Sequence, residues 1–217
     1  MSKETIPNIA KEILTDFLGE SGSILYSSHE TLKLGEVYLL GFNPGGAGGN
    51  PFEKNIDSML LNTTNAYLDE SWENRNGVWA NGEAPLQKRV QWVLESVGLN
   101  ARNVCASNLI FLQSRGAGDI SYSLAEKCWP VHEAILNVVK PKLIIAFGNS
   151  GVSPYGFMHS MFGGKEEYLP SGHGSWSLKG FNCQINGHSV YIAGLPHLSR
   201  YSPIGKEKVS EWLSKQI

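Results

Sequence analysis

The sequence predicts an α/β protein in which helices cover both faces of a four-stranded, mainly parallel central sheet, a three-layer α/β/α sandwich. Three observations predict this fold class. The first two are that short apolar runs of strand length recur along the chain and that segments of helical period lie between them. The third is size, because 217 residues with 41% apolar side chains supply one ample core. We therefore expect residues 1–217 to form a single domain.

Four apolar runs, rich in β-branched or aromatic residues, are the predicted strands. They are residues 36–42 (EVYLLGF), 104–111 (VCASNLIF), 142–147 (KLIIAF) and 189–195 (SVYIAGL). Because they alternate with helical segments, we expect them to run parallel in one sheet with connecting helices on its faces.

Helical period is clearest in residues 85–97 and 123–139, where apolar side chains fall on one face. The stretches 6–18 and 206–217 are predicted to add a helix at each end of the chain and to complete the outer layers. Residues 62–82 and 163–180 show no clean period, so we expect two irregular insertions. Long loops inside compact domains are more often functional than neutral.

Charge and cysteine content narrow the range of functions. The 18 basic and 20 acidic residues give a net charge of -2, so any contact with DNA must be local. Cys105, Cys128 and Cys183 lie too far apart for a C-x-x-C pair or a four-thiolate cluster. The N-terminus lacks the apolar region of a secretory signal, and no apolar run is long enough to span a bilayer. We expect a cytoplasmic monomer with no cofactor, no metal and no membrane partner.

The residues that follow each predicted strand are the candidates for a site, because ligands of open α/β sheets bind beyond the carboxyl ends of the strands. The four exits are residues 41–49 (GFNPGGAGG), 108–116 (NLIFLQSRG), 148–151 (GNSG) and 194–201 (GLPHLSRY). Neither G-x-G-x-x-G nor G-x-x-x-x-G-K-[ST] can be read in the glycine-rich exit, which disfavours a nucleotide-phosphate loop. The GNSGV turn lacks the second glycine of G-x-S-x-G, which disfavours a serine hydrolase.

Taken together, these motifs resemble the uracil-DNA glycosylase superfamily. The resemblance rests on GFNPG after the first strand, Asn108 at the end of the second, PKLIIAFG as the third and GLPHLSR after the fourth, and it spans most of the chain. The first motif is most similar to the G-x-N-P-G of the mismatch-specific and single-strand-selective branches. The second departs from the usual His-Pro-Ser-Pro-Leu-Ser or Asn-Pro-Ser-Gly-Leu-Ser-Arg, because Leu198 follows His197 directly. With three unclustered cysteines, the resemblance implies a branch without an iron–sulfur cluster.

The resemblance implies a monofunctional DNA glycosylase that hydrolyses the N-glycosidic bond of uracil or a related damaged pyrimidine in base excision repair. Asn43 would hold the attacking water, and it would position that water rather than deprotonate it, because an amide is not a useful base. His197 would donate a hydrogen bond to the charge that develops on uracil O2. These two residues are the predicted catalytic pair.

Base recognition is assigned to a second group of residues. Asn108 would accept from uracil N3–H and donate to O4, a pattern that cytosine reverses. Gly45 stands where the branches strict for uracil carry an aromatic ring that crowds C5, and Phe52 would stack on the flipped base. The other predicted base-binding residues are Gly41 and Phe42.

The predicted partner is DNA that contains uracil or a damaged pyrimidine. Leu198 would be the intercalating wedge, since flipping a base costs a few kcal/mol. The remaining predicted DNA contacts are Arg115, Ser199 and Arg200. Two alternatives stay open: a catalytically weak or silent module that binds nucleic acid or a nucleobase on the same fold, and an enzyme that acts on free nucleosides or another small molecule.

Overall fold

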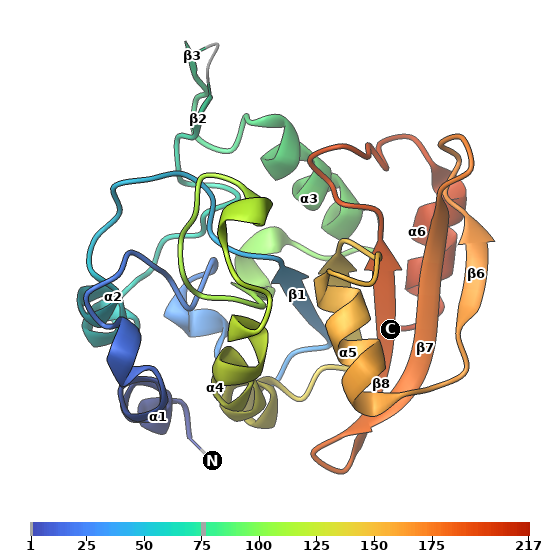
Figure 1. Cartoon of the computed structure of the whole chain (residues 1–217). Helices are drawn as coiled ribbons and strands as arrows, with labels where there is room; N and C mark the ends of the chain where they lie inside the picture. The colour runs from blue at the N-terminus through green and yellow to red at the C-terminus, as the bar shows by residue number, and fades with distance from the viewer. Residues whose placement is uncertain (1, 75–76) are drawn as a thin grey trace.

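The computed structural model describes residues 2–74 and 77–217 and has three layers, with a six-stranded sheet between two layers of helices (Figure 1). The strand order is β4-β1-β5-β8-β7-β6. The four predicted strands are adjacent and parallel: β1 (Val37–Gly41), β4 (Cys105–Asn108), β5 (Leu143–Phe147) and β8 (His188–Leu195). The predicted α/β sandwich is confirmed.

The predicted number of strands was wrong at one edge of the sheet. Strands β6 (Glu167–Pro170) and β7 (Ser177–Ile185) add to β8 in antiparallel order, and they begin inside the segment that was expected to be irregular. The side chains of β6 are mostly exposed and those of β7 include exposed polar residues, so neither strand forms a continuous apolar run. A two-residue turn with positive φ, Asn186–Gly187, joins β7 to β8.

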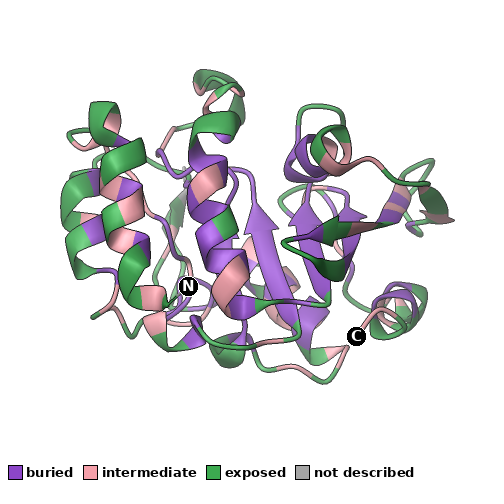
Figure 2. Cartoon of the chain, turned by 90° about the horizontal axis from the view of Figure 1, so that it is seen from below, coloured by how far each residue is buried: buried purple, intermediate pink, exposed green. Residues whose placement is uncertain are grey.

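Two apolar cores lie on opposite faces of the sheet, because successive side chains of each strand point to opposite sides. In β1, Tyr38 and Leu40 face one core, whereas Val37 and Leu39 face the other. Figure 2 shows the central parallel strands as almost wholly buried, with the exposed faces of the helices turned outward. The first core is covered by α1 (Ile6–Ile13), α2 (Phe52–Ser58), α4 (Leu124–Val139) and α5 (Pro154–Phe162), and the second by α3 (Pro85–Glu95) and α6 (Glu207–Ser214).

Helices α2 and α5 were not predicted from the sequence. The start of α5 follows from local chemistry: the Ser153 hydroxyl accepts a hydrogen bond from Gly156 N at 3.0 Å, and Pro154 takes the first helical position. Across the described residues, every helix is too short or too polar to cross a membrane.

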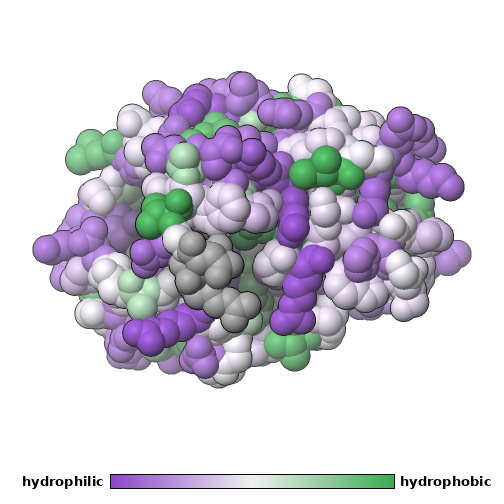
Figure 3. All heavy atoms as spheres, turned by 90° about the horizontal axis from the view of Figure 1, so that it is seen from above, coloured by the Kyte–Doolittle hydropathy of each residue, from purple (hydrophilic) through white to green (hydrophobic). Residues whose placement is uncertain are grey.

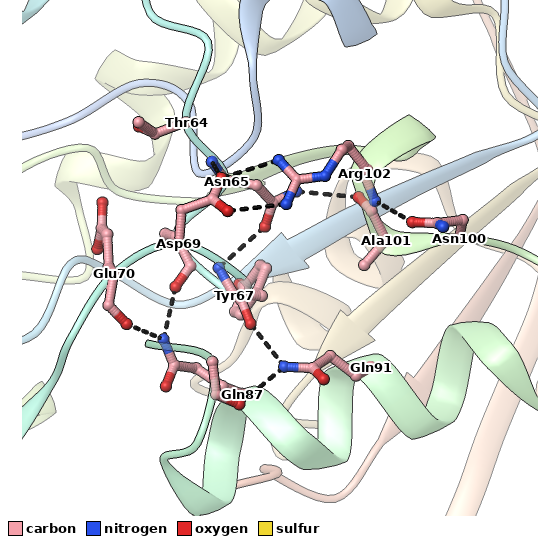
Figure 4. A network of polar contacts seen from close by, with 12 residues as sticks. Thr64, Asn65, Tyr67, Asp69, Glu70, Gln87, Gln91, Asn100, Ala101 and Arg102 are labelled. Atoms are coloured by element: carbon pink, nitrogen blue, oxygen red, sulfur yellow. Dashed lines mark hydrogen bonds and ion pairs between the residues drawn. The ribbon is translucent and has the colours of Figure 1, made fainter. Parts of the chain in front are cut away.

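The segment 62–82 is irregular, as expected, apart from a small hairpin of β2 (Glu73–Asn74) and β3 (Gly77–Val78) that projects from the body (Figure 1). Side-chain amides hold this segment against α3 (Figure 4). Gln87 donates to the carbonyls of Ala66 and Glu70, and Gln91 donates to those of Tyr67 and Gly82. These side chains hydrogen-bond backbone carbonyls that have no partner in a helix or a sheet. The segment therefore has a defined position although it lacks regular secondary structure.

His132 lies in the first core and is fully buried. Its Nε2 donates to the Leu109 carbonyl at 3.2 Å, so Nδ1 carries the lone pair and accepts from the Tyr38 hydroxyl at 2.9 Å. Burial lowers the pKa of His132 to about 4. The side chain is therefore neutral in the folded protein above that pH.

We predict that His132 makes the protein less stable as pH falls from about 6.5 to 4. In this window the unfolded chain binds a proton that the folded chain excludes, so the free energy of unfolding falls by about 1.4 kcal/mol per pH unit from this group. Urea denaturation from pH 7 to pH 4.5 measures the slope. His132→Gln should flatten it, whereas Leu136→Ala, a buried apolar truncation on α4, should lower stability at every pH without changing it. Parallel profiles for the wild type and His132→Gln would contradict the assignment.

Candidate active site

A pocket of about 1160 Å³ opens at the carboxyl ends of the parallel strands. It is lined by residues that follow all four predicted strands, among them Asn43 after β1, Asn108 at the end of β4, Gly148 after β5 and His197 after β8. Figure 3 looks down on this end of the molecule, which is mostly hydrophilic, with isolated hydrophobic residues. The parallel sheet thus brings together side chains that are far apart in the sequence.

Asn43 is held by three hydrogen bonds from the same amide nitrogen. Nδ2 donates to the Pro44 carbonyl at 2.9 Å, to the Leu112 carbonyl at 3.3 Å and to Ser114 Oγ at 2.8 Å. Two of these partners are carbonyls, which only accept, so the atom facing them must be the NH₂ group. Oδ1 is then the free polar atom of a half-buried side chain that lines the pocket, and it accepts no hydrogen bond from any described residue.

Gln113 fastens the glycine-rich loop that follows Asn43. Its Nε2 donates to the Gly45 carbonyl at 2.9 Å, and its Oε1 accepts from Gly49 N at 3.2 Å. A parallel bridge between Gly45 and Ser114 adds to this connection. The loop is therefore cross-linked to the exit of β4. Sequence analysis missed the role of Gln113, since only the fold brings residues 113 and 45 into contact.

Gly41 and Asn108 are register partners on β1 and β4 and lie in close contact. A Cβ at Gly41 would stand 2.1 Å from Asn108 Oδ1, so the position tolerates only glycine while Asn108 keeps its place. Asn108 is 4% exposed, and its Nδ2 has no hydrogen-bond partner among the described residues. A buried donor without a partner, in the lining of a pocket, is the arrangement that a ligand acceptor would complete.

His197 is oriented by the residues that follow it. The Ser199 N–H donates to Nδ1 at 3.2 Å, and Ser199 Oγ lies 2.7 Å from the same atom. Nδ1 therefore carries the lone pair, and the ring proton of the neutral imidazole is on Nε2. Burial, with a smaller contribution from the charge of Arg200, lowers the pKa of His197 below its usual value. The side chain is a neutral donor in the wall of the pocket.

Phe52 does not stack in the pocket, so this part of the predicted site was wrong. The side chain is fully buried, packs against Phe111 with ring centroids 6.2 Å apart and is not part of the pocket wall. Phe52 is the first residue of α2, and its side chain is directed into the first core. Phe42, in contrast, lines the pocket and packs its ring parallel to that of Tyr122 at 6.2 Å.

Leu198 is not a wedge, and the prediction of an intercalating side chain was wrong. The chain turns directly after His197, whose carbonyl accepts from Arg200 N and Tyr201 N. This turn directs Leu198 into the second core, where it is fully buried, and Arg89 donates to its carbonyl at 2.5 Å. Leu198 anchors the loop that carries His197.

The other residues predicted to contact DNA lie at the mouth of the pocket, and their role in binding DNA stays a prediction. Arg115, Ser199 and Arg200 are exposed and belong to the lining of the pocket. Lys54, on α2, is a further exposed cation at the pocket that sequence analysis did not identify. Glu70 and Glu73 also line it, so the positive charge is confined to part of the mouth.

One wall of the pocket is aromatic and was not predicted. The rings of Tyr26 and Tyr67 are 5.9 Å apart, and those of Tyr67 and Trp72 are 6.0 Å apart. Tyr67 and Trp72 come from the segment that Gln87 and Gln91 hold in place. The irregular insertion thus builds part of the site, but nothing in its sequence indicates which side chains turn inward.

Comparison with known proteins identified no relative of this chain. No model of a known protein family matches the chain, and no curated protein matches it. Within the described residues, no cluster of three or more His, Cys, Asp or Glu side chains could hold a metal ion.

We predict that Leu198→Ala lowers the free energy of unfolding by about 2–5 kcal/mol, because it leaves a cavity in a packed core. Denaturant unfolding of the purified variant measures the loss. Ile204→Ala, at a side chain that is 49% exposed, is the control and should change stability by less than about 0.5 kcal/mol. A Leu198→Ala variant as stable as the wild type would show that this side chain leaves the core in solution.

Proposed function

We propose that the protein is a monofunctional DNA glycosylase that hydrolyses the N-glycosidic bond of uracil or a related damaged pyrimidine in DNA. One observation carries the proposal. The amide oxygen of Asn43 and the amide nitrogen of Asn108, both without a hydrogen-bond partner among the described residues, line the same pocket as the neutral donor of His197. The accompanying expectation of a cytoplasmic monomer stays a prediction.

Asn108 supplies recognition of the base in this proposal. Leaving a buried donor unpaired costs about 1–3 kcal/mol, which a ligand carbonyl at that position would relieve. Uracil offers O4 as that carbonyl and N3–H as the adjacent donor, and the Asn108 amide matches both. Cytosine presents an amino group in place of O4, so two donors would face each other.

Hydrolysis then needs a nucleophile and a means to stabilise the leaving group. A water that donates to Asn43 Oδ1 attacks C1′ of the sugar while the bond from C1′ to N1 breaks. The electron pair of that bond passes to the base, and the Nε2–H of His197 stabilises the charge on O2. The water leaves a hydroxyl on C1′ and releases its other proton to solvent, and the base anion is protonated from solvent. Asn43 orients the water and removes no proton.

The charges and the loop after His197 favour unpaired DNA as the substrate. With Leu195, Leu198 and Tyr201 all buried, residues 195–201 offer no exposed apolar side chain to replace a flipped base in the stack. The few kcal/mol needed to unstack a base from a duplex are therefore not repaid, whereas an unpaired base needs much less. Phosphate contacts are limited to the exposed cations Lys54, Arg115 and Arg200.

A second candidate function is a catalytically silent module that binds a nucleobase in DNA. It is favoured by the position of Asn43, whose NH₂ group is engaged with the protein, so that the side chain offers a single neutral oxygen to the sugar. Such a module would retain uracil-containing DNA without releasing base.

The test is incubation with uracil-containing single-stranded and duplex oligonucleotides, followed by alkali cleavage. We predict that Asn43→Ala lowers single-turnover excision by about 100-fold or more, because the water loses its positioning partner. Ser114→Ala is the matched control: it removes one tether of the Asn43 amide while Oδ1 remains, and we expect a loss below about tenfold. Wild-type rates for Asn43→Ala would remove this residue from the mechanism, and binding without excision by the wild type would favour the silent module.

We predict a dependence on pH that follows His197. Its pKa is lowered in the folded protein, so excision should be constant from pH 8 to about 6.5 and fall only below that value. Protonation of Nδ1 breaks the contact with the Ser199 N–H, and the ring loses its orientation. Arg200→Gln removes one cause of the lowered pKa and should move the acid limb to higher pH. If His197→Gln retains the same acid limb in its residual activity, another group controls it.

A further inference from the structure

The small hairpin of β2 and β3 stands at the mouth of the pocket. Trp72 and Glu73, on its first arm, line the pocket, and Figure 1 shows the hairpin rising from the end of the molecule to which the parallel strands point. The two arms are paired, Glu73 with Val78, and the Trp79 N–H donates to the Trp72 carbonyl at 2.7 Å. The second arm therefore lies directly beside the wall of the pocket.

Trp79 exposes an aromatic side chain at this place. Val78 is 71% exposed and Trp79 is 40% exposed, on a face of the molecule that is mostly hydrophilic (Figure 3). The register of the two arms, continued by one pair, sets Trp79 opposite Trp72, and opposed residues of an antiparallel pair carry their side chains on the same face. An indole exposed next to a pocket offers a flat apolar surface to the part of a ligand that stays outside.

The base of the hairpin is fixed to the body of the protein. The Ser71 hydroxyl donates to the Trp79 carbonyl, and Trp72 Nε1 donates to Glu70 Oε2 at 3.0 Å. The ring of Trp72 also packs edge-on against that of Tyr67, with centroids 6.0 Å apart. The backbone of Trp79 is therefore in position before a ligand arrives, which lowers the entropic cost of binding.

Charges at the mouth indicate which part of a DNA strand meets the hairpin. The exposed cations Lys54, Arg115 and Arg200 belong to α2 and to the loops after β4 and β8. On the side of the hairpin, the lining carries the carboxylates of Glu70 and Glu73. Phosphates are attracted to the first group and repelled by the second. A strand that crosses the mouth thus turns its bases, and not its backbone, toward the hairpin.

We propose that Trp79 is a stacking platform for the unpaired base next to the one that enters the pocket. Stacking on an aromatic side chain tolerates any sequence, because every base has a flat face. It requires a base that is free of its partner strand, so the platform favours single-stranded DNA over a duplex. This inference rests on the proposed function for its substrate class, but it concerns binding of the strand and does not depend on hydrolysis.

The test measures the affinity for labelled single-stranded oligonucleotides by fluorescence anisotropy. Each strand holds one 2′-fluoro-2′-deoxyuridine, because the fluorine disfavours positive charge on the sugar and slows loss of the base. One strand has all its bases, a second lacks the base on the 5′ side of this nucleotide, and a third lacks the base on its 3′ side. Trp79→Ala should weaken binding of the complete strand by about fivefold or more. The loss should vanish on one of the two strands that lack a neighbouring base, which identifies the side that stacks.

Two matched variants control for effects other than stacking. Trp79→Phe keeps a ring and should retain most of the affinity. Tyr168→Ala, at a 59% exposed tyrosine on β6 outside the lining of the pocket, should match the wild type on every strand. Thermal melts establish that each variant is folded, and Trp79→Leu replaces Trp79→Ala if the latter is not.

Each other outcome decides against the platform or against the proposed function. Unchanged affinity for the complete strand, or an equal loss on all three strands, overturns the platform. Unchanged DNA binding with a loss of self-association would assign Trp79 to a contact between two copies of this chain, which also overturns it. Excision is measured separately on strands with ordinary deoxyuridine. If the wild type binds these strands and releases no uracil, the proposed function fails, while the binding data still decide on Trp79. A wild type that binds no DNA overturns both.

Discussion

The site depends on the four parallel strands, whose side chains are buried on both faces of the sheet. Because β4, β1, β5 and β8 run in the same direction between two apolar cores, every exit loop starts at the same edge. At that edge the Asn108 side chain lies over Gly41, its register partner on the neighbouring strand. Because Gly41 has no side chain, the space beside β1 is free for the Asn108 amide. The position of the amide, and of the groups that face it, follows from the register of β1 and β4.

Apolar runs and helical period were enough to predict the four parallel strands of the sheet and the helices α1, α3, α4 and α6. The antiparallel edge was not predicted, because β6 is mostly exposed and the polar residues of β7, among them the exposed Asn182 and Gln184, interrupt its apolar pattern. A usable signal was present in Asn186–Gly187, a two-residue turn of the type that joins hairpin strands. For α5, Ser153 followed by Pro154 was the equivalent signal.

The motifs that follow the strands predicted correctly where the backbone of the site residues lies, but they did not predict which of the side chains are buried. Asn43, Asn108 and His197 were expected at the ends of strands and line one pocket. Phe52 and Leu198 follow the same exits, yet both are fully buried, because an apolar side chain beside an exit loop has a core within reach on either face of the sheet. Tyr26 and Gln113 were missed for the converse reason. Their importance lies in contacts with distant segments, Tyr26 with Ala106 and Gln113 with the glycine-rich loop, which no local pattern encodes.

The short loop after His197, residues 198–201, orients the imidazole firmly but exposes no apolar side chain. With no spacer residues, Ser199 is close enough to donate its backbone N–H to Nδ1, and the carbonyl of His197 closes a tight turn. That turn directs the Leu198 side chain into the second core. Core packing and the hydrogen bond from Arg89 to the Leu198 carbonyl stabilise the loop. A longer loop could present an apolar tip to DNA, but it would hold the imidazole less firmly. The geometry therefore favours a rigid donor over an exposed apolar tip, and under the proposed function this arrangement would suit a substrate whose base is already unstacked.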